Sequence, residues 1–317
     1  MYVRNKEVEI KINMNKITVL GSMNLDTTIR TERLPKPGET VHSKEMFTGG
    51  GGKGANQAIA AARNGGEVRF IGAIGKDTAG KTILELLEQD DINSQGIKEL
   101  AHTRTGSAYV MVDDKGENSI IIHGGANLKI SESHVSEVSQ LITTSDFLIA
   151  QFETNLSSIE KAFEIAKQAN VTTILNPAPA PKEIPAKLIQ STDILVPNET
   201  ELEMITGRKV TNQKELDNAA QVIHQMGVKG LIVTLGSKGA FYSFASVASG
   251  FVPAFKVDAK DTTAAGDTFI GALTAKLSVD MRNIEEAIHY GNKASSLTVQ
   301  RYGAQPSIPY ESECLKS

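Results

Sequence analysis

Cysteine and long apolar runs are scarce in this sequence, and each absence limits the class of protein. The 317 residues include a single cysteine, Cys314. One cysteine excludes an intrachain disulfide and a cysteine-based zinc site, and it fits the reducing cytoplasm. No apolar stretch approaches the length of a membrane span, and the N-terminal residues lack the apolar core of a secretion signal. The sequence therefore predicts a cytoplasmic protein with no membrane partner.

Charge of one sign is also scarce. The formal net charge is −4 and no dense Lys/Arg run is present, so nothing electrostatic favours a nucleic-acid partner. With 40% hydrophobic and 22% charged residues, the composition is that of an ordinary globular enzyme with a sizeable core. Residues 1–13 precede a second methionine, Met14. We interpret them as an N-terminal extension, with an added edge strand as the alternative.

Short apolar runs alternate with helical periodicity along most of the chain. The expected buried strands are 17–21, 68–74, 146–150, 171–175, 193–196 and 230–235. The expected helices are about 53–64, 78–89, 131–142, 156–169, 198–206 and 213–226. Near-continuous apolar strands occur where helices cover both faces of a sheet. The alternation therefore predicts one α/β domain over 14–317, with a doubly wound, mainly parallel sheet flanked by helices.

Two segments, at about 25–50 and 105–124, interrupt this alternation. The first is polar and extended, with Pro35, Pro37 and Gly38 opposing a helix, and the second has the pattern of a hairpin. A small β-sheet over an α/β domain can act as a lid that excludes water. Two ordinary surface excursions are the alternative. Because the alternating apolar residues need cover, lids shared between two subunits would give a homodimer.

The most informative segment is DTTAAGDTFIGAL, residues 261–273. Apolar residues recur at helical spacing after Gly266, so a helix begins there. The small residues Ala265 and Gly266 allow backbone N–H groups to approach a ligand, and a helix N-terminus attracts an anion such as a phosphoryl group. Asp267 lies at the same N-terminus, where it can accept a proton from a hydroxyl group. A simple helix cap is the alternative for Asp267.

Together with GGGGKGANQA at 49–58, this segment resembles the paired signatures of the ribokinase, or phosphofructokinase-B type, carbohydrate kinases. The similarity extends from Met14 to Pro309, and GSMNLD at 21–26, KPGET at 36–40 and RYGAQPS at 301–307 resemble the branch that acts on ribose. The resemblance implies transfer of the γ-phosphoryl group of ATP to O5 of D-ribose. It also implies Mg²⁺ as cofactor and K⁺ as activating cation.

The resemblance further implies a set of site residues. The transferring phosphoryl group would lie at Ala265, Gly266 and Asp267. The ribose site would comprise Asn24, Asp26, Gly52, Lys53, Asn56, Glu153 and Asp267. The ATP site would comprise Asn198, Thr234, Gly236, Ser237, Gly239 and Asn292. Magnesium would be organised by Asn198 and Glu201, largely through water, and potassium would be surrounded by Asp261, Thr263, Thr298, Arg301, Gly303 and Ser307.

The chemistry of these residue types fits such ligands. A pentose presents mostly hydroxyl groups, which suit donors and acceptors such as Asn24, Asp26 and Asn56, and a sugar lacking one hydroxyl leaves its partner unsatisfied. Magnesium prefers oxygen ligands and retains waters, so an Asn/Glu pair is sufficient. A helix cap with an exposed carboxylate is the alternative for Asn198 and Glu201.

Two other motifs compete with this interpretation. Residues 75–82 match the phosphate-loop pattern G-x-x-x-x-G-K-[ST], but no expected strand ends in the magnesium-binding Asp that such enzymes need. We expect Asp77 to cap the following helix and Lys81 to be solvated. The G-x-G-x-x-G pattern at 49–54 follows KEMF, a poor strand. The six histidines lack metal-ligand spacing and are interpreted as surface or structural residues.

Two functional alternatives remain. A kinase of the same family acting on deoxyribose, fructose or adenosine would carry the same motifs. A non-catalytic sugar-binding protein on this fold would be expected to lose the base or the phosphate ligands, whereas Asp267, Gly266, Asn198 and Glu201 are all present.

Overall fold

The computed structural model describes residues 14–181, 183–245 and 249–316. The expected N-terminal extension, residues 1–13, lies outside the described residues. Within the described part of the chain, no helix is both long enough and apolar enough to cross a membrane.

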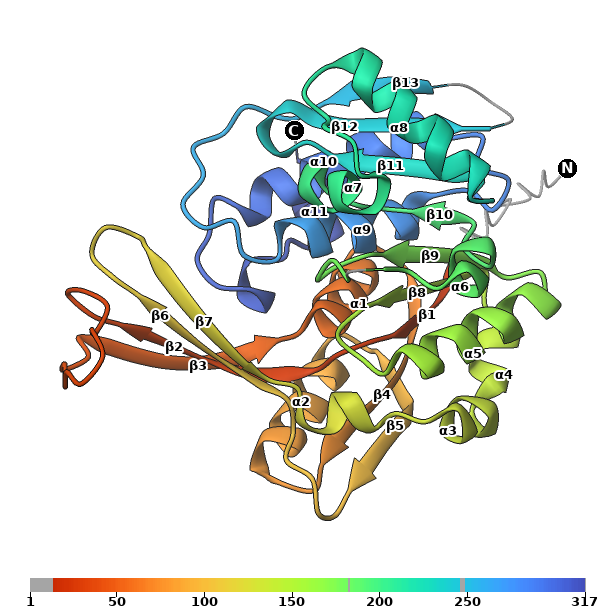
Figure 1. The fold of residues 1–317 in the computed structure, drawn as a ribbon. Helices are drawn as coiled ribbons and strands as arrows, with labels where there is room; N and C mark the ends of the chain where they lie inside the picture. The colour runs from red at the N-terminus through yellow and green to blue at the C-terminus, as the bar shows by residue number, and fades with distance from the viewer. Residues whose placement is uncertain (1–13, 182, 246–248, 317) are drawn as a thin grey trace, which may run out of the picture.

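A nine-stranded sheet forms the centre of the molecule, in the order β13-β12-β11-β10-β9-β8-β1-β4-β5 (Figure 1). The strands are β1 (Lys16–Leu20), β4 (Glu67–Gly75), β5 (Asn93–Leu100), β8 (Phe147–Gln151), β9 (Thr172–Asn176), β10 (Ile194–Leu195), β11 (Gly230–Thr234), β12 (Gly239–Phe244) and β13 (Ser249–Pro253). Neighbours from β5 to β11 pair in parallel, whereas β12 pairs antiparallel with both β11 and β13. The expected mainly parallel sheet is confirmed.

Alternate residues of the central strands pack into two cores. In β8, Phe147 and Ile149 belong to one core and Leu148 and Ala150 to the other. The first core is covered by α1 (Lys53–Arg63), α2 (Thr78–Gln89), α9 (Ala265–Lys276) and α10 (Ile284–Thr298). The second is covered by α3 (Glu132–Glu137), α4 (Ser139–Thr143), α5 (Leu156–Gln168), α6 (Ala186–Gln190), α7 (Glu199–Thr206) and α8 (Gln213–Gln225). A short α11 (Glu311–Cys314) follows. Helices therefore cover both faces of the sheet, as a doubly wound fold requires.

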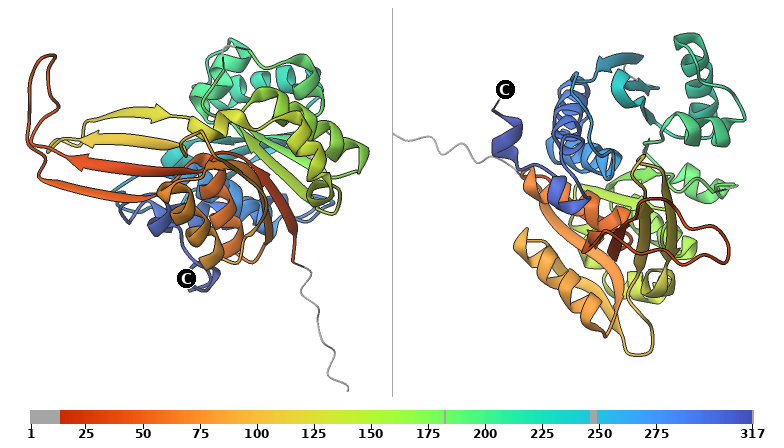
Figure 2. Two further views of the ribbon diagram at one scale, coloured as in Figure 1. Left: turned by 90° about the horizontal axis from the view of Figure 1, so that it is seen from below. Right: turned by 90° about the vertical axis from the view of Figure 1, so that its left-hand side faces the viewer.

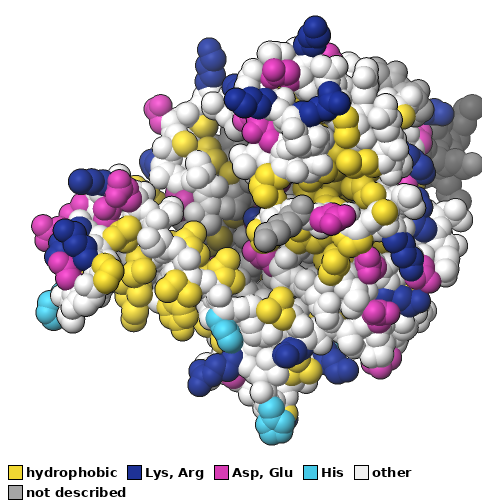
Figure 3. Space-filling view, viewed as in Figure 1, with side chains coloured by type: hydrophobic (Ala, Val, Ile, Leu, Met, Phe, Trp, Pro, Cys, Tyr) yellow, Lys and Arg dark blue, Asp and Glu magenta, His cyan; other side chains and the backbone are white. Residues whose placement is uncertain are grey.

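A second sheet of four strands projects from the domain (Figures 1 and 2). Its order is β3 (Glu45–Gly51), β2 (Asn24–Arg30), β6 (Ser107–Val112) and β7 (Asn118–His123). Figure 3 shows apolar side chains gathered on this projection. Tyr109 lies opposite Ile121 on β7 and Thr27 on β2, so these three side chains share one face, and Asp26 points to the other.

The structure differs from the sequence expectations in two places. The single helix expected at 131–142 is divided into α3 and α4 at Val138, whose φ of −102° and ψ of 16° interrupt the helical geometry. The segment KEMF was interpreted as a poor strand, but its residues 45–47 are part of β3, where they pair with β2. The pairing partner supplies the hydrogen bonds that local composition does not predict. This strand belongs to the projecting sheet, so the dinucleotide context is still missing.

Candidate active site

The N-terminus of α9 offers free backbone donors. Ala264 precedes the helix in the left-handed conformation, with φ of 60°, and its side chain makes no capping hydrogen bond. The Ala265 N–H donates to Thr262 O at 3.2 Å. The N–H groups of Gly266 and Asp267 have no acceptor among the described residues. Of the three N–H groups expected to hold the phosphoryl group, the Ala265 N–H is thus engaged with Thr262 in this structure.

Asp267 is held by side chains from α1 and does not act as a cap. Its Oδ2 accepts from Asn56 Nδ2 at 3.0 Å, and its Oδ1 accepts from Gln57 Nε2 at 2.9 Å. The side chain is only 7% exposed. Because these donors come from another helix, the capping alternative does not describe the contacts of Asp267. Its carboxylate is fixed at the mouth of a pocket.

That pocket has a volume of about 220 Å³. It brings together the start of α9, the start of α1 and the carboxyl ends of the central strands. Its lining comprises Lys53, Asn176, Val196, Asn198, Glu201, Thr234, Thr262, Ala264, Ala265, Gly266, Asp267 and Ile270. A Cβ at Gly266 would meet no atom within 4 Å, so this glycine faces open space. The crevice at the carboxyl ends of parallel strands is where open α/β sheets bind ligands.

Lys53 lies close to acidic side chains whose charges change its pKa. The nearby Asp267 carboxylate raises the pKa of Lys53, burial opposes this, and Glu153 and Glu201 raise the pKa further. The ammonium group therefore stays protonated in the pocket. Lys53 also links this region to Glu153, because its backbone N–H donates to Glu153 Oε2 at 3.0 Å. Ser22 Oγ donates to the same oxygen at 2.5 Å.

The expected sugar residues on β2 are held rigidly. Asn24 is 4% exposed, and its Oδ1 accepts from Asn127 Nδ2 at 2.9 Å. Asp26 Oδ1 accepts from the Ala108 N–H at 2.9 Å. Gly52 is the residue before α1, with φ of 89°, a conformation that favours glycine. Of the residues expected at the sugar site, Lys53 and Asp267 line the pocket, whereas Asn24, Asp26 and Gly52 are not among its lining residues.

The pKa of the Asp26 carboxyl group is raised above its ordinary value. Burial raises the pKa of Asp26 to about 6, and the charge of Glu153 adds to this, although the Ala108 N–H opposes it. A Cβ at Gly51 would lie 2.0 Å from Asp26 Oδ2, so this carboxylate occupies space that only glycine leaves free. Asp26 and Glu153 are both partly exposed, and a carboxylate whose pKa is shifted by burial and by a neighbouring charge is a candidate for a functional site.

Asn198 and Glu201 form a capping box at the start of α7. Asn198 Oδ1 accepts from the Glu201 N–H at 2.8 Å, and Glu201 Oε2 accepts from the Asn198 N–H at 2.9 Å. The capping alternative is thus correct in its geometry but wrong about exposure, because Glu201 is 9% exposed and lines the pocket. Burial raises the pKa of Glu201.

The other residues expected at the ATP site come from β11, the turn after it and α10. Thr234 lines the pocket and donates through its N–H to Pro197 O at 3.0 Å. Gly236 and Ser237 continue into an exposed 3₁₀ turn that ends at Gly239. Asn292 is buried, and its amide donates to Val252 O at 3.1 Å and Pro253 O at 3.2 Å. Asn292 is not among the pocket-lining residues. Its hydrogen bonds hold the end of β13 against α10.

The expected potassium residues form two groups. Asp261 accepts from the Thr263 N–H and Oγ1 and from the Gly303 N–H, at 2.9, 2.6 and 2.9 Å. Burial opposes the shift, but the hydrogen bonds from Thr263 and Gly303 lower the pKa of Asp261. The other three side chains bond elsewhere. Thr298 Oγ1 contacts Thr268 Oγ1, Arg301 pairs with Glu313, and Ser307 Oγ donates to Ala304 O.

The phosphate-loop alternative is not supported by the geometry. Asp77 caps α2 by accepting from the Gly80 N–H at 2.9 Å, as expected. The Lys81 side chain is 80% exposed. Among the histidines, His134 donates to Gly96 O and His224 donates to Val228 O, and the other ring nitrogen of His224 hydrogen-bonds Ser243 Oγ. These are structural contacts. No group of three potential metal-binding His, Cys, Asp or Glu side chains occurs in the described ranges.

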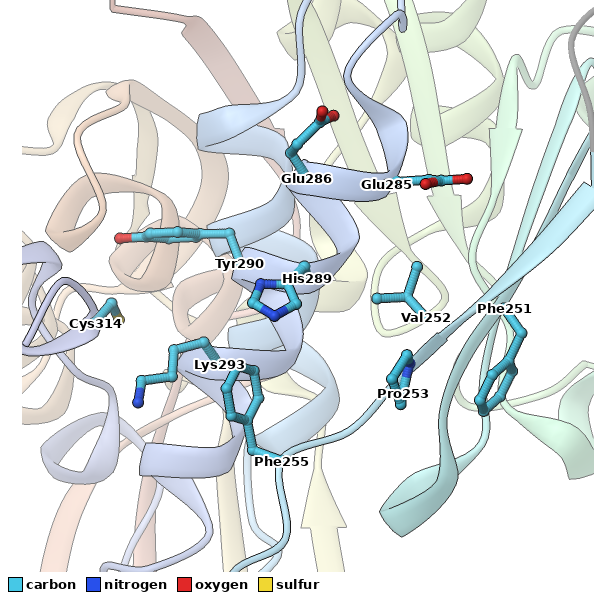
Figure 4. Close-up of a pocket in the computed structure, with 10 residues that line it drawn as sticks. All are labelled: Phe251, Val252, Pro253, Phe255, Glu285, Glu286, His289, Tyr290, Lys293 and Cys314. Carbon is cyan, nitrogen blue, oxygen red and sulfur yellow. The ribbon is translucent and has the colours of Figure 1, made fainter. Parts of the chain in front are cut away.

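A larger cavity, of about 540 Å³, lies between β13, α10 and α11 (Figure 4). Its polar side chains are occupied by structural contacts. Lys293 lies 5.1 Å from the ring centre of Phe255, Glu285 accepts from Tyr242, and the Tyr290 hydroxyl donates to Asn64 at 2.8 Å. This cavity lacks the converging acids and free N–H groups of the smaller pocket, so the smaller pocket is the candidate active site.

Residues 14–311 match the model of the pfkB family carbohydrate kinases, and the chain belongs to this family. It is 45% identical to the ribokinase of Staphylococcus aureus (strain COL), over 93% of this chain and 97% of the relative. It is 42% identical to the ribokinase of Haemophilus influenzae, over 95% and 97%. The solved structure of Arabidopsis thaliana ribokinase complexed with ribose and ATP is 35% identical, with a TM-score of 0.90 over 95% of this chain and 98% of that one.

Proposed function

We propose that this chain is an ATP-dependent ribokinase that converts D-ribose to ribose 5-phosphate. The observation that carries the proposal is the position of Asp267, whose buried carboxylate lies beside two free N–H groups at the start of α9. The relatives of known name support ribose and ATP as substrates, because they match the chain over nearly its full length.

In the proposed reaction, O5 of ribose attacks the γ-phosphorus of ATP in line with the departing ADP oxygen. Asp267 accepts the O5 proton as the O–P bond forms. The Gly266 and Asp267 N–H groups donate to the phosphoryl oxygens, where negative charge develops. The Lys53 ammonium group lies close enough to be influenced by Asp267, and it adds positive charge to the same space. Asn24, Asp26, Asn56 and Glu153 bind the sugar hydroxyl groups.

Magnesium and potassium are part of the proposal. Asn198 and Glu201 present oxygen atoms to the pocket but are partly engaged with each other, which suits a magnesium ion that keeps most of its waters. When bound, Mg²⁺ would neutralise charge on the ATP phosphates. The Asp261, Thr263 and Gly303 cluster offers the oxygen-rich surroundings that a potassium ion needs, with Thr298, Arg301 and Ser307 on the adjoining segment.

We further propose that the four-stranded sheet is a lid shared by two subunits. Met46, Tyr109 and Ile121 are 69%, 48% and 61% exposed and lie on the face opposite Asp26. A second copy would cover this face, while the Asp26 face covers the sugar and excludes water. Cytoplasmic location stays a prediction from the sequence.

The central test is Asp267→Asn. We expect the variant to fold and to bind ribose and ATP, with kcat lower by about 10²- to 10⁴-fold because the proton acceptor is lost. Steady-state kinetics and calorimetric binding measure these quantities. Asp77→Asn is the matched control, since it retains the cap of α2 far from the reaction and should keep normal turnover. Near-normal turnover of Asp267→Asn would contradict the assignment.

The acceptor must be tested separately. A panel of ribose, deoxyribose, fructose and adenosine, with and without potassium, should show the highest kcat/KM for ribose. A clear preference for another acceptor would replace ribose within the same family, and ribose binding without ATP consumption would favour the non-catalytic alternative.

A further inference from the structure

Two fully buried glutamines next to the pocket have no part in the reaction described so far. Gln57 on α1 and Gln151 at the end of β8 are each 0% exposed. Neither is among the residues that line the pocket. A buried amide is retained only where its hydrogen bonds compensate for the loss of water, so their partners show what they do.

The partners form a chain that ends on Asp267. Gln151 Nε2 donates to Gln57 Oε1 at 2.6 Å. Gln57 Nε2 donates both to Asp267 Oδ1 at 2.9 Å and to Asn176 Oδ1 at 3.2 Å. Asn176 Nδ2 in turn donates to Val196 O at 2.9 Å.

The direction of this chain is fixed by the backbone. The Val196 carbonyl can only accept, so Asn176 must direct its NH₂ group there and its oxygen toward Gln57. Gln57 must then direct its NH₂ group toward Asn176 and Asp267, which leaves its oxygen for the NH₂ group of Gln151. Rotating the Gln57 amide by 180° would place its oxygen against the carboxylate. The orientation that holds Asp267 is therefore the only one that satisfies the network.

Gln151 itself is kept in an unfavourable position. Its Oε1 is buried and has no hydrogen-bond partner among the described residues. A Cβ at Gly21 would lie 2.4 Å from this atom, so the neighbouring glycine makes room for it. The cost of the unsatisfied Gln151 oxygen is explained by the hydrogen bond that its NH₂ group donates, because that bond orients Gln57.

We propose that Gln57 and Gln151 are positioning residues that hold the Asp267 carboxylate in the orientation needed to accept the sugar proton. This inference rests on the proposed role of Asp267 as the base. Asn56, the second donor to Asp267, also belongs to the proposed sugar site, and its buried Oδ1 has no hydrogen-bond partner within the described part of the chain. Gln57 differs because its contacts serve Asp267 and the amide chain alone. A fixed donor needs no reorganisation during proton transfer, so the chain acts on kcat more than on substrate binding.

The test uses Gln57→Met and Gln151→Met, because methionine matches glutamine in length and is apolar. For Gln57→Met we expect kcat to fall about 10- to 100-fold, the effect of losing a hydrogen bond to a charged group, with KM for ribose and for ATP within about twofold of the original. Gln151→Met should lower kcat by a smaller factor. The double variant should be no slower than Gln57→Met alone, because both substitutions break the same chain.

Thr18→Val is the control. Thr18 lies in β1, and its buried hydroxyl donates to Leu141 O of α4. Removing this hydroxyl should lower the melting temperature without changing kcat. Asp267→Asn is measured in parallel. If it loses turnover while Gln57→Met stays within twofold of the original kcat, the positioning role is wrong and the base remains. If Asp267→Asn keeps its turnover, both proposals fail.

Other outcomes would also overturn the inference. A raised ribose KM with unchanged kcat would assign Gln57 to the sugar pocket. Multiplicative effects of the two substitutions would show that the glutamines act independently. If Gln57→Met does not fold, the kcat and KM of Gln151→Met decide between the positioning role and a purely structural one.

Discussion

The carboxylate of Asp26 occupies a position that depends on its neighbours. It lies against Gly51, accepts from the Ala108 N–H, and is close enough to Glu153 for their charges to interact. Burial makes its ionised form unfavourable, so the pKa of Asp26 rises from 3.8 to about 6. The side chain proposed to bind the sugar is therefore also one with a raised pKa.

The raised pKa predicts a pH dependence. Because the folded value exceeds the unfolded one, the contribution of Asp26 to stability is full below about pH 4 and is lost as the pH rises through about 6. Asp26→Asn should thus be more stable than the original protein at pH 8, and this advantage should disappear near pH 4. Ribose KM of the original protein should rise below pH 6, as the proposed acceptor becomes protonated.

Thermal unfolding and ribose kinetics across pH 4–8 measure both effects. Glu45→Gln, an exposed acid on the adjacent β3, serves as the control and should leave the ribose KM profile unchanged. A flat ribose KM between pH 5 and 7 would argue against Asp26 as a sugar ligand.

At the scale of residues, the sequence was informative where a motif combined with a physical role. Asp267 was predicted from its place at a helix start, and Asp77 was predicted as a cap. Gln57 lies inside the 49–58 motif, yet nothing in the spacing of that motif predicted its hydrogen bond from α1 to Asp267 on α9. Gln151 and Asn176 end buried parallel strands, and that position was the signal available for them.

At the scale of elements, the contact between α1 and α9 controls the site, since α9 carries Asp267 and α1 carries both of its side-chain donors. The two helices touch at Gly271, where a Cβ would lie 2.3 Å from the Gln57 carbonyl oxygen and 2.6 Å from Ala60 Cβ. Only glycine permits this approach.

Gly271→Ala should therefore separate the helices. We expect a loss of about 1–3 kcal/mol in the free energy of unfolding from overpacking, with a fall in kcat because Asp267 moves relative to its donors. Denaturant unfolding and steady-state kinetics on the folded protein test this. Unchanged kcat in a destabilised variant would mean that the site tolerates helix displacement.

Most central strands of the large sheet could be predicted from apolar periodicity, because helices cover both faces of the sheet and these strands are buried. The edge strand β5, whose residues are largely exposed, was not predicted, and neither were β12, β13 and the helix α10. Helix α3–α4 was predicted as one element, because periodicity continues across Val138 while the backbone does not. The start of strand β3 was interpreted as a poor strand from its composition, because the pairing with β2 that stabilises it is not visible in the local sequence.

At the scale of the whole molecule, the exposed apolar face of the small sheet predicts self-association. Ile121→Lys would place a charge on this face and should convert a dimer to a monomer, with higher ribose KM as lid closure loses its support. Sedimentation analysis and kinetics measure the two effects. Met204→Lys, at a 53% exposed site on α7, is the control and should change neither. A monomeric original protein would refute the shared lid.

The path of the chain between the two sheets has a further consequence. Strand β1 ends at Leu20 and β2 begins at Asn24, so three residues separate a core strand from a lid strand. Asn24 and Asp26 are both carried on β2, which belongs to the proposed lid. If the small sheet swings outward as a lid, the proposed sugar contacts would leave with it, and a water molecule entering the open cleft would meet ATP in an incomplete site. In the proposed kinase, hydrolysis of ATP by water would thus be limited in two ways. The closed lid would exclude water, and the open lid would leave the acceptor site incomplete.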